Sequence, residues 1–198
     1  MQNTTSLKIV IFGIEENKLL VLLQNNRLIK DIVSADKDLN ELAKETFTGI
    51  TEIPLKESYI EQLYTFRDNK KEISIVYYIL LSEKKNTLSL QFQWKDIKNL
   101  KKTDEDYPII EYAVQRLRWK IEYTNIIYSL LPQTFTLPQL QKAYETIFGK
   151  ALDKRNFRKK ILSLNFLVAT GQKNKGTTRP ALTYRFKRRT PTIVKVFS

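Results

Sequence analysis

The sequence predicts an α+β fold with a strand-rich first half and a helical second half that ends in a short hairpin. Branched apolar runs separated by short polar turns fill the first half, as is typical of strands. Two capped helical patterns and a loop rich in Gly, Lys and Thr fill the second. About 42% of the residues are apolar, which is enough to bury a core.

The first half reads as strands around one helix. LKIVIFGI and KLLVLLQ flank the turn EEN and predict a hairpin, and SYIEQLYTF, EISIVYYILLS and residues 88–94 predict further strands. LNELAKETFTGI has helical composition, and we expect Gly49 to cap its C-terminus. A long helix is expected to begin with Asp106 as N-cap and Pro108 in its first turn, and to end near Pro132.

Composition excludes several kinds of site. The chain has no cysteine, so it has no disulfide, no thiolate zinc site and no cysteine nucleophile. It has no histidine either, which removes any histidine-based triad. No apolar run reaches the roughly 18 residues of a membrane span, and the N-terminus does not resemble a signal peptide. We therefore expect a cytoplasmic protein.

Charge is distributed unevenly along the chain. Residues 1–107 hold 16 Lys and Arg against 17 Asp and Glu, a net charge of −1. Residues 108–198 hold 18 against 4, a net charge of +14. A field of this sign and strength attracts polyanions, so the second half is predicted to bind nucleic acid in a salt-dependent way.

The second half carries two helix starts of the same design. Thr136 is followed three residues later by Gln139, which is a capping box, and Gly149 is expected to close this helix. The next helix is LDKRNFRKKILSL, with Asp153 as N-cap and with Phe157 and Ile161 on its buried stripe. Five cationic side chains occupy residues 154–160, and Lys154, Arg155, Arg158 and Lys159 are predicted to point away from that stripe.

A basic hairpin follows this basic helix, which is the layout of a winged helix-turn-helix. In that arrangement Arg155 and Asn156 suit base edges, whereas Lys159 suits phosphates. The candidate DNA-binding residues are Thr136, Gln139, Lys154, Arg155, Asn156, Arg158, Lys159, Lys173, Lys175, Thr177, Arg179 and Arg185. The alternative is a basic helical hairpin of a ribosomal or RNA-processing protein.

Several motifs between Glu122 and Phe186 resemble the C-terminal domain of the Nudix-related transcriptional regulators of the NrtR type, namely FTLPQLQ, LDKRNFRKKIL and TYRF. Residues 59–68 and the run LLVLLQNNR resemble strands around the Nudix helix of that family. The resemblance implies a Nudix-like α/β/α sandwich with a mixed sheet in residues 1–107. It also implies a linker helix in residues 108–131 and a winged-helix DNA-binding domain in residues 132–198.

The Nudix box itself is degenerate. Working Nudix hydrolases follow G-x5-E-x7-R-E-U-x-E-E-x-G-U, with helix carboxylates that hold Mg²⁺. If Glu41 takes the first helix glutamate position, Asn40 replaces the arginine and Lys44 replaces a glutamate. If Glu45 takes that position, the glutamate pair is absent. The stretch RLIKDIVSADKD also lacks the expected glycines. We expect no metal, no cofactor and no catalytic residue.

The resemblance implies a repressor that senses a small effector, either ADP-ribose or a related nucleotide of nicotinamide (NAD) metabolism, or a sugar. Arg27, Gln62, Tyr64 and Phe66 are the candidate effector-binding residues, and strand alternation predicts the last three on one face. A bacterial homodimer on a pseudo-palindromic double-stranded operator is expected. Two alternatives stay open: a Mg²⁺-dependent hydrolase of nucleoside diphosphate derivatives with an appended nucleic-acid module, and a non-specific DNA- or RNA-binding protein.

Overall fold

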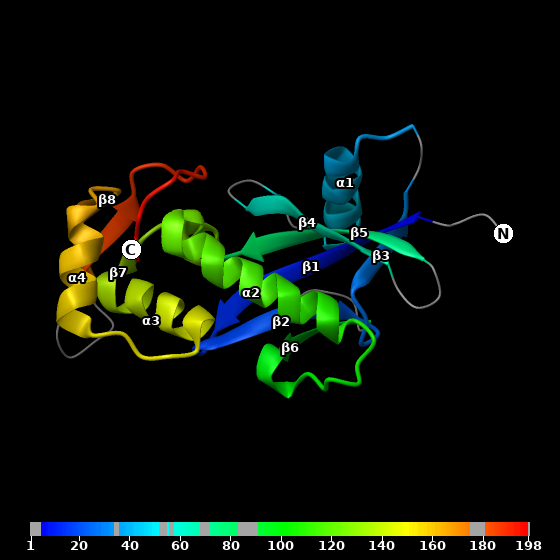
Figure 1. Cartoon of the computed structure of the whole chain (residues 1–198). Coiled ribbons are helices and arrows are strands. Elements are labelled where there is room, and N and C mark those ends of the chain that lie inside the picture. The colour runs from blue at the N-terminus through cyan, green and yellow to red at the C-terminus, as the bar shows by residue number, and fades with distance from the viewer. Residues whose placement is uncertain are drawn as a thin grey trace.

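The fold is given by a computed structural model that describes residues 5–33, 36–51, 55, 58–67, 72–82, 91–174 and 181–197, with the side chains of 172–174 outside this set. In these ranges the chain forms two sheets and four α-helices (Figure 1).

The larger sheet is mixed, as expected, and has six strands. Its path is β4 (Tyr59–Arg67), β5 (Ile73–Leu81), β1 (Thr5–Glu15), β2 (Lys18–Gln24) and β6 (Phe92–Asp96), and β3 (Ile29–Ile32) pairs with β1 off this path. β1 runs parallel to β5 and antiparallel to β2. Glu16 and Asn17 turn the β1–β2 hairpin with φ of 48° and 61°, the left-handed conformation of a two-residue hairpin turn.

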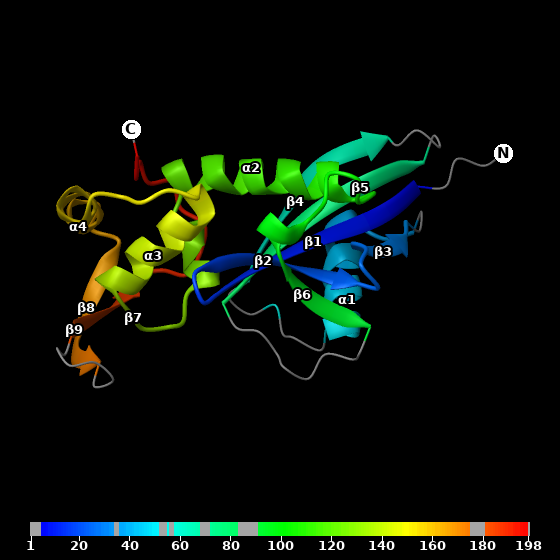
Figure 2. The same cartoon turned by 90° about the horizontal axis from the view of Figure 1, so that it is seen from below.

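One helix covers each face of this sheet (Figure 2). α1 (Leu39–Thr51) packs over Ile9 and Ile11 of β1, whereas α2 (Tyr107–Tyr123) shares a buried cluster with Val10 and Phe12. Successive residues of β1 therefore point to opposite helices, because strand side chains alternate. The result is an α/β/α sandwich, with β1 buried along most of its length.

The C-terminal part is a winged helix-turn-helix. β7 (Phe135–Thr136) leads into α3 (Leu137–Phe148), a turn and α4 (Lys154–Ser163), and the hairpin of β8 (Leu167–Asn174) and β9 (Ala181–Phe186) follows. The three strands pair in the order β7, β9, β8.

The two parts share one hydrophobic core. A single buried cluster includes Phe12 of the large sheet, Leu117 of α2, Leu140 of α3 and Phe157 of α4. The segment before the C-terminus packs against this cluster, since the ring centroids of Phe197 and Tyr144 lie 5.4 Å apart. Because the core is continuous, it marks no boundary between parts. The predicted division of the chain into residues 1–107, 108–131 and 132–198 therefore stays a prediction.

Two sequence expectations about helix ends are wrong. α2 ends at Tyr123 and not near Pro132, and a short 3₁₀ helix, η2 (Ile126–Leu130), follows it. The reason is long-range, because the C-terminal segment bonds the last carbonyls of the helix: the Val194 N–H donates to the Tyr123 carbonyl and the Val196 N–H to the Glu122 carbonyl, each at 2.8 Å. Gly49 lies inside α1 and does not cap it. The strand expected at residues 88–94 is β6, and residues 88–90 lie outside the described ranges.

Asp106 occupies the N-cap position of α2, but its side chain forms no capping bond there. Its carboxylate instead accepts hydrogen bonds from Lys8 Nζ at 2.8 Å, Arg27 Nε at 2.9 Å and the Leu28 N–H at 2.9 Å. Burial opposes ionisation, but these three donors together hold the pKa of Asp106 below its usual value. One buried carboxylate thus joins the start of α2 to β1 and to the loop before β3.

Replacing Asp106 by asparagine should lower the free energy of unfolding by about 3 kcal/mol, because it leaves the buried Lys8 ammonium without its countercharge. Denaturant unfolding measures the change. The depressed pKa stabilises the fold above the unfolded carboxyl pKa of about 3.9, and this stabilisation is lost as the pH falls through the native value. The difference between the two proteins should therefore shrink below about pH 4.

Glu105→Gln is the control, since that side chain is about half exposed and should contribute less than about 1 kcal/mol. Equal losses in the two variants at neutral pH would contradict the role given to Asp106.

Candidate nucleic-acid interface and candidate effector site

Helix α4 separates a buried stripe from a cationic face. Asp153 caps its N-terminus by accepting the Asn156 N–H at 2.7 Å, as predicted. Phe157 and Ile161 are buried in the shared core. All five α4 residues proposed to contact DNA are exposed, namely Lys154, Arg155, Asn156, Arg158 and Lys159. No acidic residue occurs within α4, so nothing on the helix itself neutralises this face.

A polar clamp from α3 fixes the turn before α4. Gln141 donates to the Leu152 carbonyl at 2.9 Å, and Glu145 accepts the Leu152 N–H at 3.1 Å. That N–H lowers the pKa of Glu145, so the carboxylate that holds the turn is ionised at neutral pH. Gly149 ends α3 with φ of 70°, the left-handed conformation expected of it. The i, i+4 spacing of Gln141 and Glu145 was a signal for this clamp that the sequence reasoning missed.

Two of the proposed DNA contacts lie in the cap of α3. The Gln139 N–H donates to Thr136 Oγ1 at 3.3 Å, and Gln139 Oε1 accepts the Thr136 N–H at 2.7 Å, which confirms the capping box. Thr136 is buried, so its hydroxyl faces the cap and not the solvent. Gln139 is exposed at the start of the helix.

The wing is only partly described. Arg185 is exposed on β9, where it pairs with Val168 of β8. Lys175, Thr177, Arg179 and the side chain of Lys173 lie outside the described residues.

The four candidate effector residues do not form one site. Arg27 is bound to Asp106 and Glu105 at the start of α2. Gln62 accepts a hydrogen bond at 3.4 Å from Tyr77, which belongs to the core cluster under α1. Tyr64 lies on the other face of the sheet, in an aromatic group described next.

The prediction that Gln62, Tyr64 and Phe66 share a face is wrong. The pairing of β4 with β5 shifts register between Gln62 and Tyr64, so the extra residue of a β-bulge reverses the alternation. Tyr64 and Phe66 consequently face α2, where both rings contact Tyr112 with centroid distances of 5.5 and 6.0 Å.

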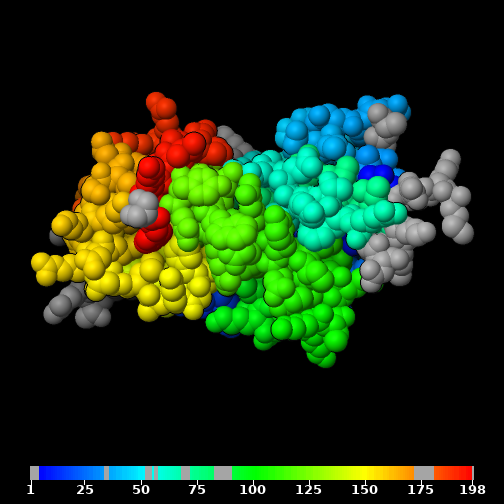
Figure 3. All heavy atoms as spheres, viewed as in Figure 1, coloured from blue at the N-terminus to red at the C-terminus, as the bar shows by residue number. Residues whose placement is uncertain are grey.

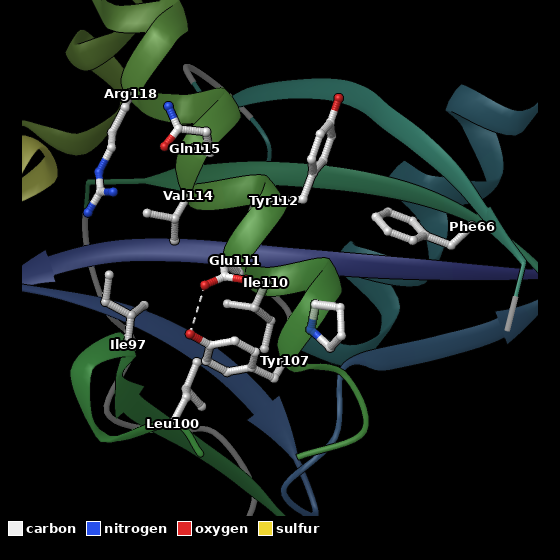
Figure 4. Close-up of a pocket in the computed structure, with 11 residues that line it drawn as sticks. Phe66, Ile97, Leu100, Tyr107, Ile110, Glu111, Tyr112, Val114, Gln115 and Arg118 are labelled. Carbon is white, nitrogen blue, oxygen red and sulfur yellow. Dashed lines mark hydrogen bonds between the residues drawn. The ribbon is translucent and has the colours of Figure 1, made fainter. Parts of the chain in front are cut away.

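The outer flank of α2 borders a cleft of about 560 Å³. Figure 4 shows Tyr107, Glu111, Gln115 and Arg118 along one side of the helix, with Ile97 and Leu100 below them. Phe66 also lines the cleft, whereas the other three candidate effector residues do not. Its volume falls in the range of small-ligand pockets, although it lies on the sheet face opposite α1.

Glu61 forms a further polar centre, which the sequence reasoning missed. Its carboxylate accepts hydrogen bonds from Tyr59 and Tyr78, each at 2.6 Å, and from Lys120 of α2 at 2.8 Å. Burial works against ionisation, but these donors keep the pKa of Glu61 below its usual value. The centre ties β4 and β5 to α2.

The carboxylates of α1 are paired with lysines. Glu41 accepts from Lys44 at 2.7 Å, and Glu45 binds Lys37. Within the described ranges, no three Asp, Glu, His or Cys side chains lie close enough together to hold a metal ion. In the same part of the chain, no helix is both long and apolar enough to cross a membrane.

Comparisons with known proteins agree with this architecture. Residues 127–186 match the family model described as the NrtR DNA-binding winged helix domain. The ADPR-responsive transcriptional repressor NtrR of Acinetobacter baylyi is 26% identical over 197 residues, covering 89% of this chain and 79% of its own length.

Two solved structures have a similar fold over nearly the whole chain. The crystal structure of Shewanella oneidensis NrtR with a 27mer DNA has a TM-score of 0.77 at 25% identity, covering 92% of this chain and 93% of its own. A MutT/nudix family protein from Enterococcus faecalis has a TM-score of 0.75 at 18% identity, covering 95% and 89%. The first half therefore has a Nudix-like fold.

Replacing Asp153 by alanine should lower the free energy of unfolding by about 1 kcal/mol, because the N–H groups at the start of α4 lose their acceptor. Urea unfolding measures the loss. Ser163→Ala at the other end of α4 is the matched control, and a change below about 0.5 kcal/mol is expected for this exposed position. An unchanged stability of the Asp153 variant would contradict the capping role.

Proposed function

We propose that the chain belongs to the NrtR-type Nudix-related regulators and that it is a sequence-specific DNA-binding transcriptional repressor. Its effector would be ADP-ribose or a chemically related ligand. The exposed face of α4 carries this proposal, because four cations and an asparagine project from a capped helix that holds no acid. Helices of this position in winged helix-turn-helix proteins enter the major groove.

The individual roles follow from side-chain chemistry. Arg155 can bind guanine edges with two parallel hydrogen bonds, and Asn156 can do the same with adenine. Lys154, Arg158 and Lys159 would contact phosphates, which position the helix without reading sequence. Arg185 supports a wing contact from β9. The other proposed wing contacts are Lys173, Lys175, Thr177 and Arg179.

The effector would bind the Nudix-like domain and act through α2. The similar protein of Acinetobacter baylyi is described as ADPR-responsive, which favours ADP-ribose over a sugar. α2 contacts both parts, since Lys120 binds Glu61 of the sheet and Arg118 donates to the Ile147 carbonyl of α3 at 2.9 Å. A ligand that shifts α2 against the sheet would therefore move α3 and α4.

We also propose that the domain does not hydrolyse its ligand. The box lacks the glutamate pair, and the remaining Glu41 and Glu45 each bind a lysine. A cation in that position removes the charge that a magnesium site needs. Such a regulator would act in the cytoplasm.

A duplex-binding titration at physiological salt tests the function. The probe is the DNA upstream of the protein's own gene, and a scrambled duplex is the control. Binding to the probe should be at least about a thousandfold tighter. ADP-ribose should weaken it, and ADP-ribose incubated with the protein and Mg²⁺ should remain intact.

Each other outcome has a definite meaning. Specific binding that ADP-ribose does not change would keep the repressor and exclude this effector. Equal, salt-sensitive binding to both duplexes would reduce the protein to a non-specific nucleic-acid binder and contradict the proposal. Turnover of ADP-ribose would show a hydrolase.

Arg155→Ala should weaken binding to the specific duplex by about 1–3 kcal/mol and leave the scrambled duplex nearly unaffected, because a base contact is lost. Lys159→Ala should weaken both duplexes alike and reduce the salt slope by about one, because a phosphate contact is lost. Fluorescence anisotropy over a salt series measures both effects.

Arg67→Ala is the matched control, since it removes an equal charge from an exposed position on β4. Specific affinity that is unchanged in Arg155→Ala, or lowered as much in Arg67→Ala, would overturn the assignment of α4.

A further inference from the structure

Residues 189–197 form a strap that follows β9, passes the end of α2 and finishes in the core of the winged helix. Figure 3 shows the strap in red on the surface, between α2 in green and the yellow and orange helices of the winged helix. The views in Figures 1 and 2 agree that it lies beside the end of α2. The strap therefore lies between the two parts whose relative position matters for DNA binding.

The first part of the strap is hydrogen-bonded to the residues that end α2. The Asn125 side chain donates to the Thr190 carbonyl at 3.1 Å and accepts the Thr192 N–H at 2.7 Å. The Val194 N–H donates to the Tyr123 carbonyl at 2.8 Å. Carbonyls in the last turn of a helix have no partner within the helix, so these bonds satisfy them. The position of the strap and the position of the end of α2 are therefore coupled.

The last part of the strap inserts into the core of the winged helix. Val196 is fully buried there. The ring of Phe197 packs against three rings of α3 and α4, with centroid distances of 5.4 Å to Tyr144, 5.3 Å to Phe148 and 6.5 Å to Phe157. Those three rings are held in helices, whereas Phe197 belongs to an extended segment. The strap is therefore the part of this core that can leave without unfolding a helix.

One polar group in this core opposes the closed packing. The Tyr144 side chain is fully buried, and within the described part of the chain no group forms a hydrogen bond with its hydroxyl. A buried hydroxyl without a partner has lost its bonds to water and gained none. Departure of the strap opens this core to water, so the hydroxyl favours the released strap, whereas burial of Val196 and Phe197 favours the closed one. The closed state is therefore less stable than its apolar contacts alone would make it.

We propose that the strap is a latch with two states, closed as in this structure and released, and that the Tyr144 hydroxyl sets the balance between them. In the closed state the latch holds the end of α2 against α3 and α4. In the released state the winged helix loses this tie and turns more freely against the large sheet. The inference deepens the proposed function and rests on it for one consequence, namely that an effector acting through α2 opens the latch.

Amide hydrogen exchange measures the opening of the latch without DNA. The amides of Thr192, Val194 and Val196 donate to residues 122–125, and they should exchange faster than the amides of the central strand β1. Tyr144→Phe removes only the hydroxyl. It should slow exchange of the three strap amides about tenfold, because the closed state then buries no unpartnered group.

Tyr107→Phe is the matched control for this variant. Its hydroxyl has a partner, since it donates to Glu111 at 2.9 Å, and it lies at the opposite end of α2 from the strap. Exchange of the strap amides should be unchanged in this protein.

Phe197→Ala tests the apolar side of the balance. It removes the ring that the strap inserts into the core, so the same amides should exchange about a hundredfold faster. Ile193→Ala is the matched control on the strap itself, because that side chain is 77% exposed. It should change the exchange by no more than about twofold. Circular dichroism checks that all variants are folded.

The consequence for regulation is measured as operator affinity with and without ADP-ribose. Tyr144→Phe should bind the operator as tightly as the unaltered protein, because the closed state already predominates. Its response to ADP-ribose should be weaker by about the same factor as its slower exchange, since the effector must work against a more stable latch. A substitution that only stabilised the fold, without acting on the latch, would leave the full response.

Strap amides that exchange equally fast in Tyr144→Phe and the unaltered protein, or that exchange only through global unfolding, would overturn the latch. These outcomes are distinguishable from failure of the proposed function because exchange is measured without DNA. Slower exchange in Tyr144→Phe in a protein that binds no operator would keep the latch and remove the repressor. A full response to ADP-ribose in Tyr144→Phe would overturn the link between the latch and the effector.

Discussion

The burial of one helix from two sides is the constraint on which the structure depends. Leu117 and Ile121 of α2 are fully buried in a core that extends from the large sheet to the winged helix. Polar contacts fix the helix in place: Asp106 holds its start, Lys120 reaches Glu61 in the sheet, and Arg118 reaches the end of α3. Protein interiors are close-packed, so a displacement of α2 is transmitted to the sheet and to the winged helix and is not absorbed locally.

The charged side chains have different roles in the two halves of the chain. In the first half, carboxylates such as Glu41, Glu61 and Asp106 bind the protein's own cations. The second half has four acidic residues, and two of them, Glu145 and Asp153, hold the turn and the cap before α4. Its carboxylates therefore orient the cationic helix without neutralising it. The net charge of +14 over residues 108–198 stays available to a polyanion.

Several features that depend only on neighbouring residues were predictable. The capping box at Thr136, the left-handed Gly149 and the cap at Asp153 each involve groups within a few residues of one another, and all three predictions are confirmed. Features that depend on distant residues were not. The end of α2 is set by hydrogen bonds from Val194 and Val196, and the face of Tyr64 is set by a β-bulge in the pairing of β4 with β5.

The sequence by itself determined the α+β class, the winged helix-turn-helix, the asymmetry of charge and the helix that carries the cations, because periodicity, capping and composition are local properties. Only the tertiary structure decided that the two halves share a core and that Arg27 binds Asp106. It also decided that the aromatic residues of β4 and α2 meet on one exposed face. These outcomes depend on which residues distant in sequence pack together, and the local sequence pattern does not specify those contacts.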